Sequence, residues 1–314
     1  MKPLIFALLS AFAFACASAQ THVWQPSPGH TQVQIWPGAA PDPQPAKGPE
    51  SVETTGKRSL VAGRPWTAVS NVTRPTMTVY SPTGKNTGAA VVVFPGGGYE
   101  ILAIDLEGTE VCDWLTSKGI TCVLLKYRVP ARRSSPDWGA YPQSSMALED
   151  AQRTMGLVRL HAAEWHIDPH RIGVLGFSAG GHLVAAISTH FERRLYPAVD
   201  AADKESCRPD FAVAIYPGHL SIYHDRPLVL NRNVPVTART PPTFLLQAED
   251  DDVDGVQQAL TYYIALKKAA VPTEMHLYAH GGHAFGLRRT KLPITAWPEL
   301  VEKWLRTIGM IAGG

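Results

Sequence analysis

Residues 171–180 read RIGVLGFSAG, and this stretch decides the fold. Its first part is a short apolar run of the kind that forms a buried strand, and the residues from Gly181 to about Thr189 have the pattern of a helix. Ser178 stands in the sharp turn between the two. Gly176 and Gly180 leave room for a tight backbone on either side of it. A strand, a G-x-S-x-G turn and a helix together are typical of a serine that is presented as a nucleophile.

The composition is that of a globular protein with ample material for a core. The chain has 314 residues, of which 45% are hydrophobic and 18% charged. This length allows one large α/β domain or two small ones. We find no internal repeat and no second domain, and we predict a single domain. The formal net charge of +2 gives no reason to expect a nucleic acid or an anionic membrane as partner.

Residues 1–19 have the features of a secretory signal peptide. Lys2 supplies a positive start, residues 4–15 are apolar, and an A-x-A pattern ending at Ala19 predicts the cleavage site. We therefore expect a secreted or periplasmic protein. Lipoprotein processing at Cys16 is an alternative that the preceding residues fit poorly. No later stretch is apolar for long enough to span a bilayer.

The rest of the chain divides into an arm and a main domain. Residues 20–65 are rich in proline, glycine and polar residues, and predict an extended arm that wraps the domain. In residues 66–314, apolar runs alternate with helical patterns, which predicts a mainly parallel sheet with helices on both faces. The expected strands are 66–71, 76–80, 89–94, 121–127, 171–176, 211–216, 243–246 and 273–278. The expected helices are 107–118, 144–166, 181–189, 255–269 and 296–308.

The cysteines leave their pairing open. Once Cys16 is removed with the signal peptide, an odd number remains: Cys112, Cys122 and Cys207. An oxidising compartment would permit one disulfide, but the sequence does not say which. Because Cys122 stands inside an apolar strand, the simplest interpretation is a buried thiol. None of them has the spacing of metal ligands, and we expect neither a metal nor an organic cofactor.

Polar residues gather where the predicted parallel strands end, which is where such sheets bind their ligands. A triple glycine, residues 96–98, follows one strand and Ser178 another. The acidic run 249–252 follows a third strand, and His280 and His283 follow the fourth. A nucleophile, an acid and a histidine, in that order along the chain, are the parts of an acyl-transfer site.

The general base is expected to be His283 rather than His280. His283 stands within a glycine-rich segment, residues 281–286, which can carry an imidazole over the serine. The acid is harder to choose. Asp250 is the aspartate nearest the strand end and is our first choice, with Asp251 as the alternative that stays open.

An acyl-transfer site also needs N–H donors for the oxyanion. Ala179, directly after the nucleophile, offers one, and Gly97 and Gly98 are expected to offer the others. The alternative for the triple glycine is a phosphate-binding loop, but the glycine patterns of such loops are missing.

At this point the residues resemble those of a known family. Segments 95–99 (PGGGY) and 175–183 (LGFSAGGHL), with the acid and histidine segments, are similar to α/β-hydrolase esterases of a secreted bacterial branch that includes acetyl-xylan esterase and feruloyl-esterase-like enzymes. The resemblance runs from about Trp66 to Ile308 and implies the α/β-hydrolase fold. Pro95 stands where many members have histidine. The resemblance favours Asp250, but the segment after the acid is one residue longer than usual.

The resemblance and the site together predict a secreted serine esterase that acts on short acyl esters, such as acetyl groups on plant polysaccharide. Ser178, Asp250 and His283 would form its triad, and a small-molecule or carbohydrate ester would be its partner. The alternatives are a serine peptidase or amidase of the same fold, a feruloyl-type esterase, and a carbohydrate-binding relative without activity.

Overall fold

The computed structural model describes residues 23–43, 48–57, 59–129, 141–221 and 228–312, and for residues 141–144 it describes the backbone alone. The expected signal peptide, residues 1–19, lies outside the described residues. None of the helices in the described part of the chain is long and apolar enough to cross a membrane.

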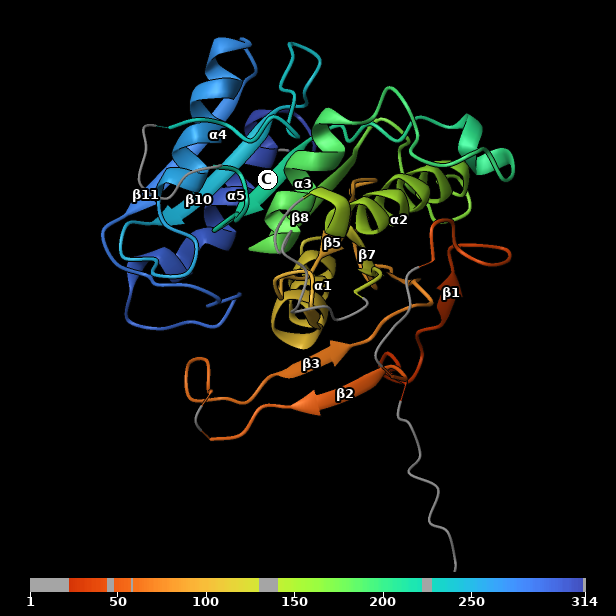
Figure 1. Ribbon diagram of the computed structural model, residues 1–314, viewed down its shortest axis with the longest axis horizontal. Helices are drawn as coiled ribbons and strands as arrows, with labels where there is room; N and C mark the ends of the chain where they lie inside the picture. Colours follow the sequence, from red (N-terminus) through yellow and green to blue (C-terminus); the bar gives the residue numbers. More distant parts are fainter. Residues whose placement is uncertain (1–22, 44–47, 58, 130–140, 222–227, 313–314) are drawn as a thin grey trace, which may run out of the picture.

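A sheet of eight strands runs through the described residues in the order β1-β4-β7-β5-β8-β9-β10-β11 (Figure 1). From β7 to β11 all neighbours are parallel, whereas β4 and β1 add an antiparallel edge. The strands are β1 (Gln32–Gln34), β4 (Thr76–Tyr80), β5 (Ala90–Phe94), β7 (Thr121–Lys126), β8 (Ile172–Phe177), β9 (Ala212–Ile215), β10 (Thr243–Ala248) and β11 (Thr273–Tyr278).

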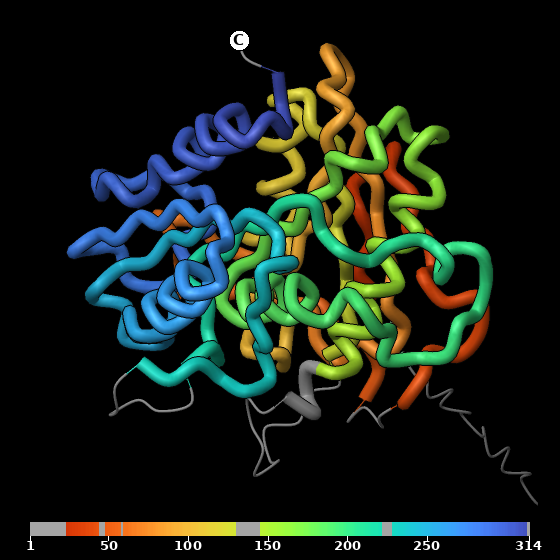
Figure 2. The backbone as a smooth tube through the Cα atoms, turned by 90° about the horizontal axis from the view of Figure 1, so that it is seen from above, coloured from red at the N-terminus to blue at the C-terminus, as the bar shows by residue number. Residues whose placement is uncertain are grey.

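Helices cover both faces of this sheet, as the sequence predicts. Every residue of β5, β7, β8, β9 and β10 is buried, which explains their unbroken apolar runs. On one face lie α1 (Glu110–Ser117) and α5 (Trp297–Thr307), joined by an edge-to-face contact between Trp114 and Trp297. The other face carries α2 (Tyr141–Leu160), α3 (Ala179–Thr189) and α4 (Gln257–Lys268) (Figure 2). Short 3-10 turns occur at Ala201–Lys204 and Pro293–Ala296.

The helix expected at 107–118 starts with a π-helical turn, and its α-helical part begins only at Glu110. A π-helical turn, Asp105–Thr109, precedes α1 and turns Glu107 into the protein interior. Just before it, the unpredicted strand β6 (Ile101–Ala103) joins β3 (Thr67–Ser70) and β2 (Ser51–Thr54) in a small antiparallel sheet of order β2-β3-β6. The oxyanion loop predicted at 96–98 is thus fixed between β5 and this second sheet.

The arm predicted at 20–65 contributes a strand to each sheet, β1 to the large one and β2 to the small one. Between these two strands, hydrogen bonds to α2 fix the arm on the domain. The Trp36 indole donates to Asp150 Oδ1 (2.8 Å), and Arg153 donates to the Ile35 carbonyl (2.8 Å). The described parts of the arm are therefore built into the fold.

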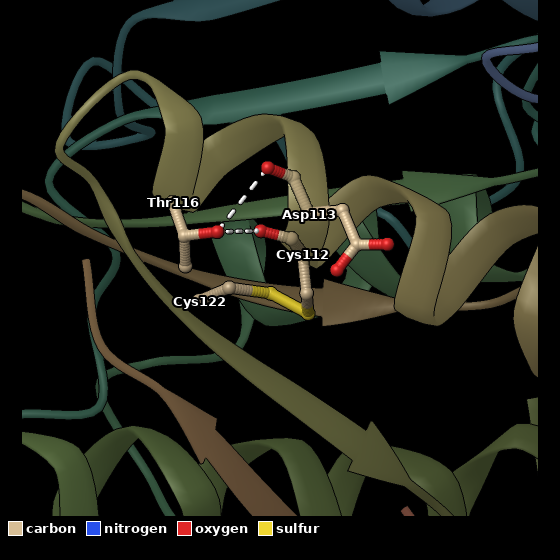
Figure 3. The surroundings of a disulfide bond; sticks show 4 residues. All are labelled: Cys112, Asp113, Thr116 and Cys122. Carbon is tan, nitrogen blue, oxygen red and sulfur yellow. Dashed lines mark hydrogen bonds between the residues drawn. A yellow bond between two sulfur atoms is a disulfide. The ribbon is translucent and has the colours of Figure 1, made fainter. Parts of the chain in front are cut away.

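A disulfide joins α1 to β7. Cys112 and Cys122 are bonded, with their Cα atoms 5.1 Å apart, and both are fully buried (Figure 3). The interpretation of Cys122 as a free thiol is therefore wrong. The helix that packs on this strand brings a second cysteine to it, a contact that the strand pattern alone does not reveal. Cys207 is the buried free cysteine.

Candidate active site

The turn between β8 and α3 holds Ser178 in an unusual backbone conformation, with φ 51° and ψ −117°. The residues two positions before and after it must be glycines. A Cβ on Gly176 would lie 2.2 Å from the carbonyl oxygen of Gly180, and a Cβ on Gly180 would lie 2.1 Å from that of Phe94. The packing thus fixes a strained turn that pushes the serine out of the sheet.

His283 reaches the serine from the loop after β11. Its Nε2 lies 3.0 Å from Ser178 Oγ, which is hydrogen-bond distance for proton transfer. The loop turns sharply because Gly282 (φ 63°), Ala284 (φ 55°) and Gly286 (φ 55°) have left-handed backbones. The other candidate, His280, is three-quarters exposed and does not contact the serine; it pairs with Asp250 (3.2 Å).

The acid that contacts the imidazole is Asp251. Its Oδ2 lies 2.7 Å from His283 Nδ1, and its side chain is fully buried. Oδ1 accepts the backbone N–H groups of Val253 (3.0 Å) and Asp254 (2.9 Å), and the Gln247 amide donates to Oδ2 (3.0 Å). These bonds hold the carboxylate in one orientation.

The first choice from the sequence, Asp250, does not contact His283. Its Oδ1 accepts the N–H groups of Gly281 and Gly282, each at 2.8 Å, so it fastens the start of the histidine loop from outside. The Gly282 N–H bond is the main cause that lowers the pKa of Asp250 below its usual value. Closeness to the strand end was the wrong criterion, because successive residues after the strand point in different directions.

Three carboxylates affect the pKa of His283. Burial lowers the pKa of the imidazole, but the hydrogen bond and charge of Asp251 and the charges of Asp254 and Glu107 outweigh it. The pKa therefore lies above the ordinary value. Because the neutral ring donates Nδ1–H to Asp251, its Nε2 is left as the acceptor that faces the serine.

The triple glycine lies directly against Ser178. Gly97 and Gly98 line the cavity that contains Ser178, and a Cβ on Gly96 would lie 3.0 Å from Ser178 Cβ. Gly97 has φ 134° and packs on the Ile101 carbonyl, where a Cβ would come within 2.3 Å. Ala179 is the first residue of α3, so its N–H has no partner within the helix.

Sequence reasoning missed a buried carboxyl beneath this loop. Glu107 Oε2 accepts the Gly96 N–H (2.7 Å), and Glu107 Oε1 accepts the Tyr216 hydroxyl (2.7 Å). The Tyr216 oxygen in turn accepts the Gly286 N–H (3.1 Å) from the histidine loop. Burial raises the pKa of Glu107, and its hydrogen bonds oppose that rise. Nothing in the local sequence marks Glu107, because its partners Gly96 and Tyr216 lie 11 and 109 residues away in the chain.

His182 supports the same loop from α3. Its Nδ1 lies 2.7 Å from the hydroxyl of Tyr99, the residue that follows the triple glycine. Burial lowers the pKa of His182 to about 3, so the ring is neutral at ordinary pH. The histidine thus braces the loop without adding charge to the site.

Ser178 and His283 open into a cavity of about 320 Å³. Its walls include Trp66, Leu106, Val253, Gln258 and the loop after β9, which supplies His219 and Ser221. Asp254, also missed as a site residue, lines it beside the serine. A larger cavity of about 510 Å³ lies between the arm and the β4 edge and is lined by none of these residues. Among the described residues, no group of three or more side chains is placed to hold a metal ion.

The fold, together with the contacts between Ser178, His283 and Asp251, is typical of one class of protein. A family model described as the alpha/beta hydrolase fold matches residues 91–287, the part that carries Ser178, Asp251 and His283. The chain belongs to this family.

Particular relatives narrow the comparison. The chain is 30% identical over 211 residues to the acetylxylan esterase of Xylanibacter ruminicola, a match covering 63% of this chain and 41% of that protein. It is 28% identical over 209 residues to the probable carboxylic ester hydrolase LipM of Mycobacterium tuberculosis, covering 59% and 46%. The matches thus span less than half the length of either relative.

A solved structure is similar over nearly its whole length. The acetyl ester-xyloside bifunctional hydrolase from Caldicellulosiruptor lactoaceticus superposes with a TM-score of 0.67 at 32% identity, covering 90% of this chain and 97% of that one.

Proposed function

We propose that this protein is a secreted serine carboxylic ester hydrolase that acts on short acyl esters, with acetyl groups of xylan-type polysaccharide as the leading substrate. The observation that carries the proposal is the hydrogen-bonded series Asp251, His283, Ser178, with contacts of 2.7 Å and 3.0 Å. The named activities of the relatives support the ester and the acetyl group.

In the proposed reaction, Ser178 Oγ attacks the acyl carbon while its proton passes to His283 Nε2. Asp251 keeps Nδ1–H in place and stabilises the imidazolium. The N–H groups of Gly97, Gly98 and Ala179 receive the negative charge that forms on the carbonyl oxygen. The tetrahedral intermediate collapses, and the alcohol leaves with the Nε2 proton. Water then attacks the acyl-enzyme by the same route and releases the acid.

The first experiment compares wild type with Ser178→Ala on p-nitrophenyl acetate, butyrate and octanoate, acetylated xylan, methyl ferulate and a peptide anilide. Loss of the nucleophile is expected to lower kcat by about 10⁴-fold or more while the far-UV circular dichroism stays the same. Acetate release from xylan supports the polysaccharide substrate. Activity on small esters alone removes xylan, and cleavage of only the anilide would overturn the esterase in favour of an amidase.

Secretion is proposed from residues 1–19 and receives support from the Cys112–Cys122 disulfide, a bond typical of oxidising compartments. Mass spectrometry of the exported protein is expected to find Gln20 at its N-terminus. A lipid on Cys16, or an intact N-terminus, would contradict this processing.

A further inference from the structure

Asp254 presents a carboxylate beside the reacting atoms without belonging to the series Asp251, His283, Ser178. Its Oδ2 accepts the Ser178 hydroxyl at 3.2 Å and lies 3.8 Å from His283 Nε2. Its side chain is 14% exposed, at the wall of the cavity that contains the serine. The carboxylate is therefore open to a molecule bound in that cavity.

The backbone of Asp254 is held on both sides, so the carboxylate has a fixed place. Its N–H donates to Asp251 Oδ1 (2.9 Å), and its carbonyl accepts from the Gln247 amide (2.9 Å). The carboxylate packs on the backbone of Gly218, where a Cβ would lie 2.5 Å from both oxygens. A residue larger than glycine at position 218 would displace it.

The side of the substrate that meets Asp254 follows from the chemistry. The leaving oxygen must come within hydrogen-bond reach of His283 Nε2, which returns the proton to it. Because Asp254 Oδ2 lies 3.8 Å from this same nitrogen, the alcohol half of an ester passes next to the carboxylate. An ionised carboxylate only accepts hydrogen bonds, and it repels negative charge.

We infer that Asp254 is a specificity-determining residue that selects esters whose alcohol has a free hydroxyl on the carbon next to the ester carbon. Monoesters of vicinal diols, such as partly acylated sugars, have this arrangement. The adjacent hydroxyl donates a charge-assisted hydrogen bond to Asp254. It replaces the bond from Ser178 as the serine gives its proton to His283 and attacks the acyl carbon, before the alcohol leaves. The inference rests on the proposed esterase function and names the alcohol that it prefers.

The test uses two substrates in which this hydroxyl is either free or methylated, 2-hydroxyethyl acetate and 2-methoxyethyl acetate, whose leaving alcohols are of similar acidity. Wild type, Asp254→Ala and Asp254→Asn are compared with Asp252→Asn, which removes the same charge from an exposed position of the same loop. Rates are expressed per active serine, counted by titration with paraoxon. This count separates misfolding from altered preference.

The wild type is expected to prefer the hydroxyethyl ester about tenfold in kcat/KM, equal to about 1.4 kcal/mol. In Asp254→Ala this ratio falls to about one, whereas Asp252→Asn keeps it. Equal rates in the wild type, or a ratio that survives in Asp254→Ala, overturn the inference. Hydrolysis of p-nitrophenyl acetate, which has no such hydroxyl, is measured alongside. If the wild type hydrolyses none of the three esters, the proposed esterase function itself fails.

Discussion

Two adjacent aspartates have different tasks in the site. Asp251 is buried and contacts the imidazole, whereas Asp250 is partly exposed and holds the backbone of the histidine loop. Replacing either by asparagine removes the same charge from neighbouring positions. The two variants therefore separate the orientation of His283 from the anchoring of its loop.

Asp251→Asn is expected to lower kcat by about 10³–10⁴-fold, because an amide can set its NH₂ against Nδ1 and favour the wrong tautomer. Asp250→Asn, at an exposed contact, is expected to cost less than about tenfold. Steady-state kinetics on p-nitrophenyl acetate measures both. The opposite ranking would restore Asp250 as the acid.

The raised pKa of His283 predicts the pH dependence. The base must be neutral to accept the serine proton, so kcat/KM falls as the pH drops through the pKa of the free enzyme. Because that pKa lies above the ordinary value of about 6.5, the acid limb of the profile should lie at higher pH than an ordinary histidine would give. Asp254→Asn removes a charge that stabilises the imidazolium, and the acid limb of the profile should then move to lower pH. An unmoved limb would show that this charge does not act on His283.

At the scale of elements, two loops from opposite parts of the chain share one buried carboxyl. Glu107 accepts from the loop after β5, and through Tyr216 it is connected to the loop after β11. The Gly286 carbonyl of that second loop also accepts the Trp297 indole N–H of α5 (2.8 Å). The loop that carries Gly96–Gly98 and the loop that carries His283 are therefore positioned by a common set of hydrogen bonds.

Glu107→Gln tests this connection. A carboxylate accepts from both Gly96 and Tyr216, whereas an amide accepts from one and sets its own N–H against the other. Leaving one of these buried groups unpaired costs about 1–3 kcal/mol, and the loop that it holds is expected to lose its position. We therefore expect kcat to fall about 10–100-fold, with KM little changed. Tyr216→Phe removes the second link, and the double variant should lose less than the product of the two effects. A lower melting temperature with kcat intact would reduce Glu107 to a structural residue.

The disulfide belongs to the opposite end of the sheet from the site, because Cys122 lies near the start of β7 and the site lies at the carboxyl ends of the strands. Cys112→Ala/Cys122→Ala is expected to lower the free energy of unfolding by about 2–3 kcal/mol, the value for a short closed loop. Urea unfolding measures the loss. Activity at 25 °C should stay within about twofold, since residues remote from a site act nearly independently of it.

At the scale of the whole molecule, the sequence predicts the large sheet and its helices well. Runs such as 89–94 and 121–127 are buried on both faces, so their pattern is unambiguous. The short strands β1, β2 and β6 are missed because each has only three or four residues, too few for a pattern to emerge. Their pairing depends on distant partners that a local pattern does not show.

Some residues of the candidate site can likewise be predicted from the local sequence, and others cannot. Local motifs, whose glycines reveal the turns around them, predict Ser178 and His283, and the structure brings the two side chains together. Asp251, Glu107 and Asp254 are distinguished by the direction of a side chain or by a partner far along the chain. The segment after the acid is one residue longer than is usual in the family that the chain resembles. This extra length is the one feature of the sequence that points to Asp254, which lies within the segment.

The pairing of β1 with β4 has a consequence for the behaviour of the protein in solution. Unpaired strand edges are where separate molecules join and aggregate, and β1 occupies one edge of the large sheet. A chain lacking residues 23–34 would leave the backbone of β4 open, and β11 already forms the other border. Such a chain is expected to self-associate with rising concentration in sedimentation velocity, while the intact chain does not. The arm would then prevent self-association as well as form part of the fold.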